Sequence, residues 1–217
     1  MAAQAGSCMS SSYQTEQEVF WATTFGDEYI SRNISDQLLA SNISFFAKIL
    51  NSAGRLNSVL ELGANVGMNL KALRALLPDA QLAGIEINEK AYNELASHSW
   101  IKAYHGSIFD FQPSTQSDLV FFKGVLIHLN PEMLEKAYEV AYQASAKYVL
   151  FAEYYNPSPV SIPYREHKDK LFKRDFAGEI MEKYSNLKLV DYGFAYRRDP
   201  LFPQDDITWF LMEKKND

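Results

Sequence analysis

Residues 59–67, Val-Leu-Glu-Leu-Gly-Ala-Asn-Val-Gly, decide the fold of this chain. The apolar first half predicts a buried strand, and the two glycines predict a tight turn that leads into a helix. Glycine has no Cβ, so the backbone at Gly63 can adopt a positive φ and approach a ligand closely. The following helix points its free N–H groups toward the same place. The stretch therefore predicts a binding site at the end of a strand, with Glu61 as an unusual charge beside it.

A second apolar segment follows roughly twenty residues later and ends in an acid. It is Leu-Ala-Gly-Ile-Glu-Ile at residues 82–87, so Glu86 lies near the end of a second strand. A carboxylate there can accept hydrogen bonds from both hydroxyls of a ribose. Two strands, one glycine turn and one acid predict the nucleoside-binding half of an α/β domain.

The turn differs from a dinucleotide-binding fingerprint. That fingerprint, G-x-G-x-x-G, needs its second glycine to make room for a pyrophosphate, whereas Asn65 occupies the middle of this turn. Glu61 would repel a pyrophosphate and would suit a cationic amino group. The segment resembles motif I of the class I methyltransferases, E/D-x-G-x-G-x-G, with Asn65 in place of the middle glycine. The resemblance implies S-adenosyl-L-methionine, a nucleoside with a positively charged amino-acid end, as the cofactor.

Length, charge and cysteine content disfavour several other classes of protein. The 217 residues suit one α/β domain with modest additions. A net charge of −6 and an isoelectric point of about 5.3 disfavour a broad nucleic-acid-binding surface. The single cysteine, Cys8, allows no intrachain disulfide and fits a reducing cytosol. No apolar run approaches the ~20 residues of a membrane span, and the N-terminus does not resemble a signal peptide. We expect a cytoplasmic protein with a small-molecule substrate and with no nucleic-acid, membrane or metal partner; the oligomeric state stays open.

The chain divides into three parts by composition and pattern. Residues 1–12 are rich in Ala, Ser and Gly, which is typical of a disordered tail. Residues 13–50 hold an aromatic segment and then apolar residues at helical spacing, so we expect an N-terminal helical cap there. Residues 51–217 should form the class I methyltransferase domain that the motif implies.

Strands alternate with helices from residue 58 onward, which predicts a parallel sheet covered on both faces. The expected strands lie at 58–62, 81–87, 101–105, 118–123 and 148–153. After a long loop and a helix, two further strands are expected at 187–196 and 207–213. Their linker is too short for a crossover helix, so this last pair should be antiparallel. The expected fold is an α/β, Rossmann-like, doubly wound sheet of seven strands with a C-terminal antiparallel hairpin, and the resemblance adds the strand order 3-2-1-4-5-7-6.

The resemblance also assigns the cofactor contacts residue by residue. The implied cofactor-binding residues are Glu61, Gly63, Ala64, Asn65, Gly67, Glu86, Ile87, Ser107, Ile108, Lys123 and Gly124. Glu61 would lie near the ammonium, Glu86 would hold the ribose and Ile87 would pack on the adenine. Ser107 stands where the family often has an acid for the adenine amino group, and a serine accepts that bond more weakly. Lys123 would end the fourth strand beside the sulfonium.

Segments outside the cofactor motif resemble a narrower family. They are Phe-Trp-Ala-Thr-Thr-Phe-Gly-Asp-Glu-Tyr-Ile-Ser-Arg-Asn at 20–33, Glu-Tyr-Tyr-Asn-Pro-Ser-Pro at 153–159, Tyr-Arg at 164–165, Leu-Phe-Lys-Arg-Asp-Phe-Ala-Gly-Glu at 171–179 and Asp-Asp-Ile-Thr-Trp-Phe at 205–210. Together they are similar to the pseudaminic acid biosynthesis-associated methylases, over nearly the whole chain after the tail. This resemblance implies methyl transfer in a setting of nonulosonic sugars, and it does not identify the acceptor.

Candidate catalytic residues are expected at the carboxyl ends of central strands, where α/β sites open. They are His128, Glu153 and Tyr154. A hydroxyl acceptor needs a general base, whereas a neutral amine needs little help. His128 lies in an apolar stretch, so a packed or capping histidine is the alternative interpretation. Glu153 closes an apolar strand just before an aromatic, proline-rich loop, which favours contact with the acceptor.

Candidate acceptor-binding residues come from the cap and from the loop after the fifth strand. They are Trp21, Tyr29, Arg32, Tyr155, Asn156 and Arg165. The aromatic segment at 21–33 is expected to fold over the cofactor as a lid. Arginine forks suit carboxylates and phosphates, so we expect a small anionic acceptor, such as a nonulosonic acid or its nucleotide-activated form. Lys173, Arg174 and Arg197 are weaker candidates, and a solvated surface is the alternative role for most of these cations.

Two other kinds of function remain open from the sequence. One is an NAD-dependent oxidoreductase, which Asn65, Glu61 and the terminal hairpin disfavour. The other is a non-catalytic cofactor- or partner-binding protein of the same fold, because binding and catalysis share one motif. A methyltransferase with a different small-molecule or protein acceptor is also compatible with the sequence.

Overall fold

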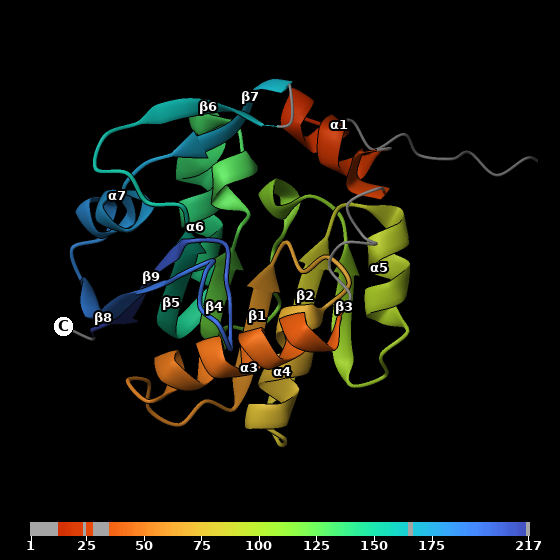
Figure 1. The fold of residues 1–217 in the computed structure, drawn as a ribbon, viewed down its shortest axis with the longest axis vertical. Coiled ribbons are helices and arrows are strands. Elements are labelled where there is room, and N and C mark those ends of the chain that lie inside the picture. Colours follow the sequence, from red (N-terminus) through yellow and green to blue (C-terminus); the bar gives the residue numbers. More distant parts are fainter. Residues whose placement is uncertain (1–12, 24, 28–34, 165–166, 216–217) are drawn as a thin grey trace, which may run out of the picture.

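A mixed sheet of seven strands forms the centre of the molecule in the computed structural model, which describes residues 13–23, 25–27, 35–164 and 167–215 (Figure 1). The strands of this sheet are β1 (Ser58–Leu62), β2 (Gln81–Glu86), β3 (Ile101–His105), β4 (Ser117–Lys123), β5 (Ser145–Glu153), β8 (Leu187–Ala195) and β9 (Ile207–Lys214). A separate hairpin consists of β6 (Val160–Tyr164) and β7 (His167–Lys173).

The order of the strands confirms the fold expected from the sequence. The order is β3-β2-β1-β4-β5-β9-β8. The first five strands pair in parallel, and β9 pairs antiparallel with both β5 and β8. The order that the resemblance implied is also confirmed, because the β6–β7 hairpin changes only the numbering of the last two strands.

Helices cover both faces of the sheet. They are α1 (Glu16–Ala22), α3 (Asp36–Leu50), α4 (Met68–Leu76), α5 (Glu89–Ala96), α6 (Leu134–Ala144) and α7 (Phe176–Lys183), with short 3-10 turns η1 (Ile108–Asp110), η2 (Leu126–His128) and η3 (Pro131–Met133). The core on one face is built with α3, α4 and α5, and the core on the other face with α6 and α7. None of the helices in the described ranges is long and apolar enough to cross a bilayer.

The segment expected as an N-terminal cap contains two different elements. α1 starts with a capping box in which Thr15 and Glu18 exchange side-chain and backbone hydrogen bonds, and it lies at the top of Figure 1, far from α3. α3 belongs to the core, because Phe46 and Ile49 are completely buried. α1 is therefore the element of this segment that lies outside the two main core clusters, whereas α3 packs on one face of the sheet.

The β6–β7 hairpin replaces the long loop that the sequence pattern suggested after β5. The segment has little strand signal, since Pro163 interrupts β6 and most residues of β7 are polar. Among the β7 residues whose side chains are described, Leu171 is buried. The hairpin lies at the top of the view in Figure 1, as α1 does.

The turn between β1 and α4 has the tight geometry that its glycines predicted. Gly63, Asn65 and Gly67 all have positive φ angles, of 84°, 48° and 79°. The N–H groups of Gly63 and Ala64 both donate to the carbonyl oxygen of Ile85 on β2, at 3.0 and 2.9 Å. Asparagine is one of the few other residues that tolerate the left-handed region, so Asn65 preserves the turn in which it replaces a glycine.

We expect Gly63→Ala to destabilise the protein more than Gly124→Ala. Both glycines have positive φ, so alanine carries a backbone cost of ~1–2 kcal/mol at each. A Cβ on Gly63 would also lie 2.7 Å from Cγ2 of Val125, whereas a Cβ on Gly124 would meet no atom of the described residues within 4 Å. Overpacking of that kind costs a further ~1–3 kcal/mol. Urea unfolding of both variants measures the difference, and equal losses would show that the turn does not pack against Val125.

Candidate functional site

A large cavity lies at the carboxyl ends of β1, β2 and β4. Its volume is about 640 Å³, within the ~300–1,000 Å³ of typical small-molecule sites. Its wall also includes α1, the first half of α3 and the linker between β8 and β9. Parallel α/β sheets open their sites at this edge, so the cavity is the candidate functional site.

Most of the residues expected to bind a cofactor line this cavity. Those that line it are Gly63, Ala64, Asn65, Glu86, Ile87, Ser107, Ile108, Lys123 and Gly124. Gly67 instead makes room for close packing, since a Cβ there would lie 2.8 Å from Cδ1 of Leu95. Glu61 lies behind the wall, and its partner Asn69 reaches the cavity. The structure thus gathers into one cavity residues from four separate loops.

Glu86 joins the two turns that border the cavity. One carboxylate oxygen accepts the backbone N–H of Asn65 at 2.7 Å, and the other accepts that of Asn88 at 2.8 Å. The side chain is 9% exposed, and burial raises the pKa of this carboxyl, against the lowering effect of the backbone hydrogen bonds from Asn88, Asn65 and Ile87. The carboxylate is therefore held rigidly at the cavity wall.

Glu61 is buried behind the cavity wall and interacts electrostatically with Lys123, which lines the cavity. Burial raises the pKa of Glu61 to about 8, although a hydrogen bond from Asn69 and the charge of Lys123 act in the opposite direction. One carboxylate oxygen of Glu61 accepts from Asn69 Nδ2 at 2.6 Å, while the other has no partner among the described residues. Burial also lowers the pKa of Lys123, which the charges of Glu61 and Asp205 partly offset.

Ser107 is engaged by an acid from the N-terminal helix. Its hydroxyl donates to one carboxylate oxygen of Glu18, and its oxygen accepts the N–H of Phe109 at 3.1 Å. The other oxygen of Glu18 accepts the N–H groups of Gln14 and Thr15 at 2.6 and 3.0 Å. Glu18 lines the cavity beside Ser107, so α1 brings a carboxylate to a position where the sequence showed only a serine.

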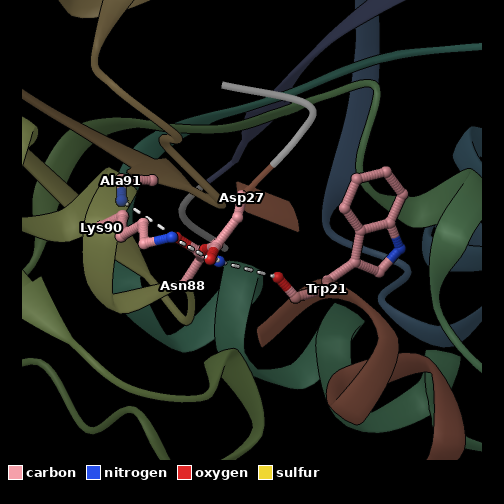
Figure 2. Close-up of polar contacts among 5 residues, drawn as sticks. All are labelled: Trp21, Asp27, Asn88, Lys90 and Ala91. Atoms are coloured by element: carbon pink, nitrogen blue, oxygen red, sulfur yellow. Dashed lines mark hydrogen bonds and ion pairs between the residues drawn. The ribbon is translucent and has the colours of Figure 1, made fainter. Parts of the chain in front are cut away.

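Asn88 fixes the segment around Trp21 to the edge of the cavity (Figure 2). Its amide nitrogen donates to the carbonyl oxygen of Trp21 at 3.3 Å and to Asp27 at 2.9 Å. Its amide oxygen caps α5 by accepting the N–H of Ala91 at 3.0 Å, and Lys90 forms an ion pair with Asp27. The helix cap that the sequence predicted at Asn88 therefore also anchors the N-terminal segment.

Two of the three candidate catalytic side chains lie at the cavity. His128 is 7% exposed, and its ring lies 4.6 Å from that of Trp21, centroid to centroid. Tyr154 lines the cavity near the end of β5, with the Lys173 ammonium 5.1 Å from the centre of its ring. Trp21, expected to contact the acceptor, completes this aromatic wall.

Glu153 faces a backbone turn rather than the cavity. Its carboxylate accepts the N–H groups of Val125 and Leu126 at 3.0 Å each and that of Ile127 at 3.5 Å. Burial raises its pKa to about 7, against the lowering effect of these three bonds. The side chain therefore holds η2, the turn that carries His128, and the expectation that it contacts an acceptor is not supported by its position.

The expected acceptor-binding residues of the loop after β5 also lie away from the cavity. Tyr155 packs against Phe210, with ring centroids 5.8 Å apart, and the amide of Asn156 donates to the Ser158 carbonyl at 2.6 Å. Arg174 pairs with Glu179 at 2.5 Å. Three further expected residues lie outside the described residues: Tyr29, Arg32 and Arg165. Arg197, a weaker candidate from the sequence, does line the cavity.

Sequence reasoning missed a polar wall made by α3 and the β8–β9 linker. Its residues are Gln37, Ser41, Asn42, Gln204 and Asp205. The sequence assigned α3 to a cap by its apolar spacing, and no local pattern predicts that its polar positions meet a linker more than 150 residues away. The available signal was the density of amide and hydroxyl side chains at 35–42.

Solved structures share this architecture. The 1,6-didemethyltoxoflavin-N1-methyltransferase of Burkholderia thailandensis, with bound 1,6-didemethyltoxoflavin and S-adenosylhomocysteine, has a TM-score of 0.69 at 11% identity, over 99% of this chain and 94% of that one. The magnesium protoporphyrin IX methyltransferase of Synechocystis PCC 6803, with bound S-adenosylmethionine, has a TM-score of 0.65 at 14% identity, over 95% of this chain and 100% of that one. CalS10, an amino pentose methyltransferase from Micromonospora echinaspora, has a TM-score of 0.61 at 11% identity, over 89% of this chain and 97% of that one.

No protein-family profile and no curated protein matches the chain in sequence. At sequence identities of 14% or less, the similarity of these three structures to the chain shows a shared fold and nothing more. The chain therefore has the fold of the S-adenosylmethionine-dependent methyltransferases.

Proposed function

We propose that this protein is a methyltransferase that uses S-adenosylmethionine and acts on a small anionic molecule. The observation that carries the proposal is the position of Glu86. Its buried carboxylate lies in the cavity wall at the end of β2, bonded to the tight turn after β1. In this fold that is the place for a group that accepts the two ribose hydroxyls.

The other cavity residues fit the remaining parts of the cofactor. Gly124 has open space around it where a Cβ would stand, so the backbone at the end of β4 can lie against a bound group. Ile87 and Ile108 offer apolar surface for an adenine, and Glu18 beside Ser107 offers a carboxylate to its amino group. Asn69, which lines the cavity, would meet the cofactor's amino-acid end, and Glu61 would lie behind it, with one oxygen that has no partner among the described residues.

Methyl transfer requires little from the protein beyond alignment of the acceptor with the methyl group. S-adenosylmethionine supplies a methyl group already activated by its sulfonium. The residues of the cavity then have to hold the acceptor in line and exclude water, and the aromatic wall of Trp21, His128 and Tyr154 can do both. If the acceptor is a hydroxyl, His128 is placed to take its proton, since Glu153 is committed to η2.

An anionic sugar is the acceptor class that the residues favour. Arg197 lines the cavity, and its Nε lies 3.4 Å from Asp206, so its outer nitrogens can still meet a carboxylate. Lys123 supplies a second cation. The resemblance to the pseudaminic acid biosynthesis-associated methylases points to a nonulosonic acid or its nucleotide-activated form. The net charge of −6 argues against a nucleic-acid substrate.

We expect Glu86→Gln to weaken S-adenosylmethionine binding by about fivefold to 150-fold. The variant replaces a carboxylate that would accept two ribose hydroxyls by an amide with one acceptor oxygen. The free energy of binding should become less favourable by ~1–3 kcal/mol. Isothermal titration calorimetry measures the affinity. Glu89→Gln is the matched control, because Glu89 is an exposed acid three residues away on α5.

The same titration with NAD separates the proposal from its oxidoreductase rival, and we expect NAD not to bind. Equal affinity of wild type and Glu86→Gln for S-adenosylmethionine would contradict the assigned site. Binding without turnover of any acceptor would favour the non-catalytic alternative.

We expect the stability of Glu61→Gln relative to wild type to increase as the pH rises from 5 to 8. The Glu61 carboxyl has a pKa of about 8 when folded, against an ordinary value of 4.5, so the native protein holds this proton more tightly than the unfolded chain. Its contribution to stability is complete below pH 4.5 and is lost as the pH approaches 8, by at most ~1.4 kcal/mol per pH unit. A glutamine cannot titrate and keeps the oxygen that Asn69 needs.

Urea unfolding at several pH values checks this expectation. Stability curves of wild type and Glu61→Gln that stay parallel between pH 5 and 8 would mean that Glu61 is already ionised in the native protein.

A further inference from the structure

The first half of α3 is bonded to the β8–β9 linker and forms one wall of the cavity with it. Gln37 Nε2 donates to the carbonyl oxygen of Leu201 at 2.8 Å. Gln204 Nε2 donates to Asn42 Oδ1 at 3.0 Å, and both of these amides are buried. Two elements far apart in sequence are thus held together at the cavity, and the polar groups along their contact keep fixed positions.

Ser41 is the most informative residue of this wall. It lines the cavity, it is 1% exposed, and its Oγ has no hydrogen-bond partner within the described ranges. A buried hydroxyl that lacks a partner is unfavourable, and such groups in native proteins call for an explanation. A ligand that reaches into the cavity would provide the missing hydrogen bond.

The neighbours of Ser41 present matching groups. The bond between Gln204 and Asn42 uses one group of each amide, and it leaves the Asn42 nitrogen as a donor and the Gln204 oxygen as an acceptor. Asp205 is exposed on the cavity side, and the structure gives its carboxylate no hydrogen bond in the part of the chain that it describes. One hydroxyl, one amide donor, one amide acceptor and one carboxylate make a set that suits the hydroxyl groups of a polyol.

The dimensions of the sheet show that the cavity is longer than the part that the cofactor would fill. The cavity reaches from the end of β2 to the start of β9, which is four steps in the order β2-β1-β4-β5-β9. At ~4.8 Å per step this is about 19 Å. A cofactor extended from Glu86 to Lys123 spans the first two steps, so the remaining two, about 10 Å, leave room for one sugar ring and its substituents.

We propose that Ser41, Asn42, Gln204 and Asp205 form the acceptor subsite and bind the hydroxyl groups of a polyhydroxylated acceptor. The proposal rests on the proposed function and deepens it. Arg197 on the same linker would bind the acceptor's carboxylate, while this polar wall would form hydrogen bonds with its hydroxyl groups. The orphaned hydroxyl of Ser41 would become paired when the acceptor binds.

The test uses the full chain saturated with S-adenosylhomocysteine and two soluble probes. One probe is N-acetylneuraminic acid, and the other is its analogue shortened by two hydroxyl-bearing carbons through periodate oxidation and reduction. Calorimetry should show that the shortened analogue binds wild type more weakly. Ser41→Ala and Asp205→Asn should each weaken binding of the intact acid about tenfold, and should leave the affinity for S-adenosylhomocysteine within twofold of wild type.

Ser44→Ala is the matched control, since Ser44 lies on the same helix and away from the cavity, and it should change neither affinity. We expect Ser41→Ala to fold, because the hydroxyl that it removes has no hydrogen-bond partner to lose among the described residues. Equal losses of S-adenosylhomocysteine and sugar affinity would assign these groups to the cofactor and overturn the proposal. Sugar affinity that is undetectable in wild type, or unchanged in both variants, would also overturn it. A wild type that fails to bind S-adenosylhomocysteine would refute the methyltransferase proposal itself.

Discussion

The hydrogen bonds of the Glu86 carboxylate are the contacts on which the cavity depends. They join the turn after β1, through the N–H of Asn65, to the start of α5, through the N–H of Asn88. Asn88 in turn binds the backbone of Trp21 and the side chain of Asp27. One buried acid therefore fixes two turns of the sheet edge and, through its neighbour, the N-terminal segment that covers them. If it were replaced by an apolar side chain, two backbone donors would be left without their acceptor at the floor of the cavity.

Two buried acids near this cavity, Glu153 and Glu61, have different surroundings. Glu153 is fully bonded to the backbone of η2 and so positions His128 without facing a ligand. Burial raises the pKa of Glu61, and one of its carboxylate oxygens has no hydrogen-bond partner among the described residues. Unpartnered buried oxygens are uncommon in native structures, and a buried acid with a perturbed pKa near a cavity is a candidate functional group. The difference separates the acid that supports the site from the acid that we propose to act in it.

Much of the fold could be predicted from the sequence because its strands carry continuous apolar runs. The runs that end in Leu62 and Glu86 are buried on both faces of a parallel sheet, and such strands are easy to recognise. The C-terminal hairpin followed from the length of its linker alone. The β6–β7 hairpin was missed, since Pro163 and a polar β7 give it almost no periodic signal. Short, exposed strands are stabilised mainly by their mutual pairing, which the local sequence does not encode.

The parts of the site that are formed by backbone turns could be predicted from the sequence. The parts that require a side chain to point in a given direction could not. The glycine turn and Glu86 have fixed places relative to strand ends, so motif spacing located them. The direction of Glu153, the carboxylate that Glu18 brings to Ser107 and the contact of Ser41 with the cavity all arise from packing between distant segments. No spacing rule reports such contacts. The polar wall of α3 and the linker is visible only once the chain is folded.

A crystal structure with S-adenosylhomocysteine soaked into the crystals would show directly whether Glu86 holds the ribose of the cofactor. We expect the ligand to lie in the cavity with both ribose hydroxyls within ~2.5–3.0 Å of the Glu86 carboxylate, and with its amino-acid end over the turn at Gly63. A ligand bound elsewhere, or one in this cavity whose ribose makes no contact with Glu86, would rule out the assigned cofactor site.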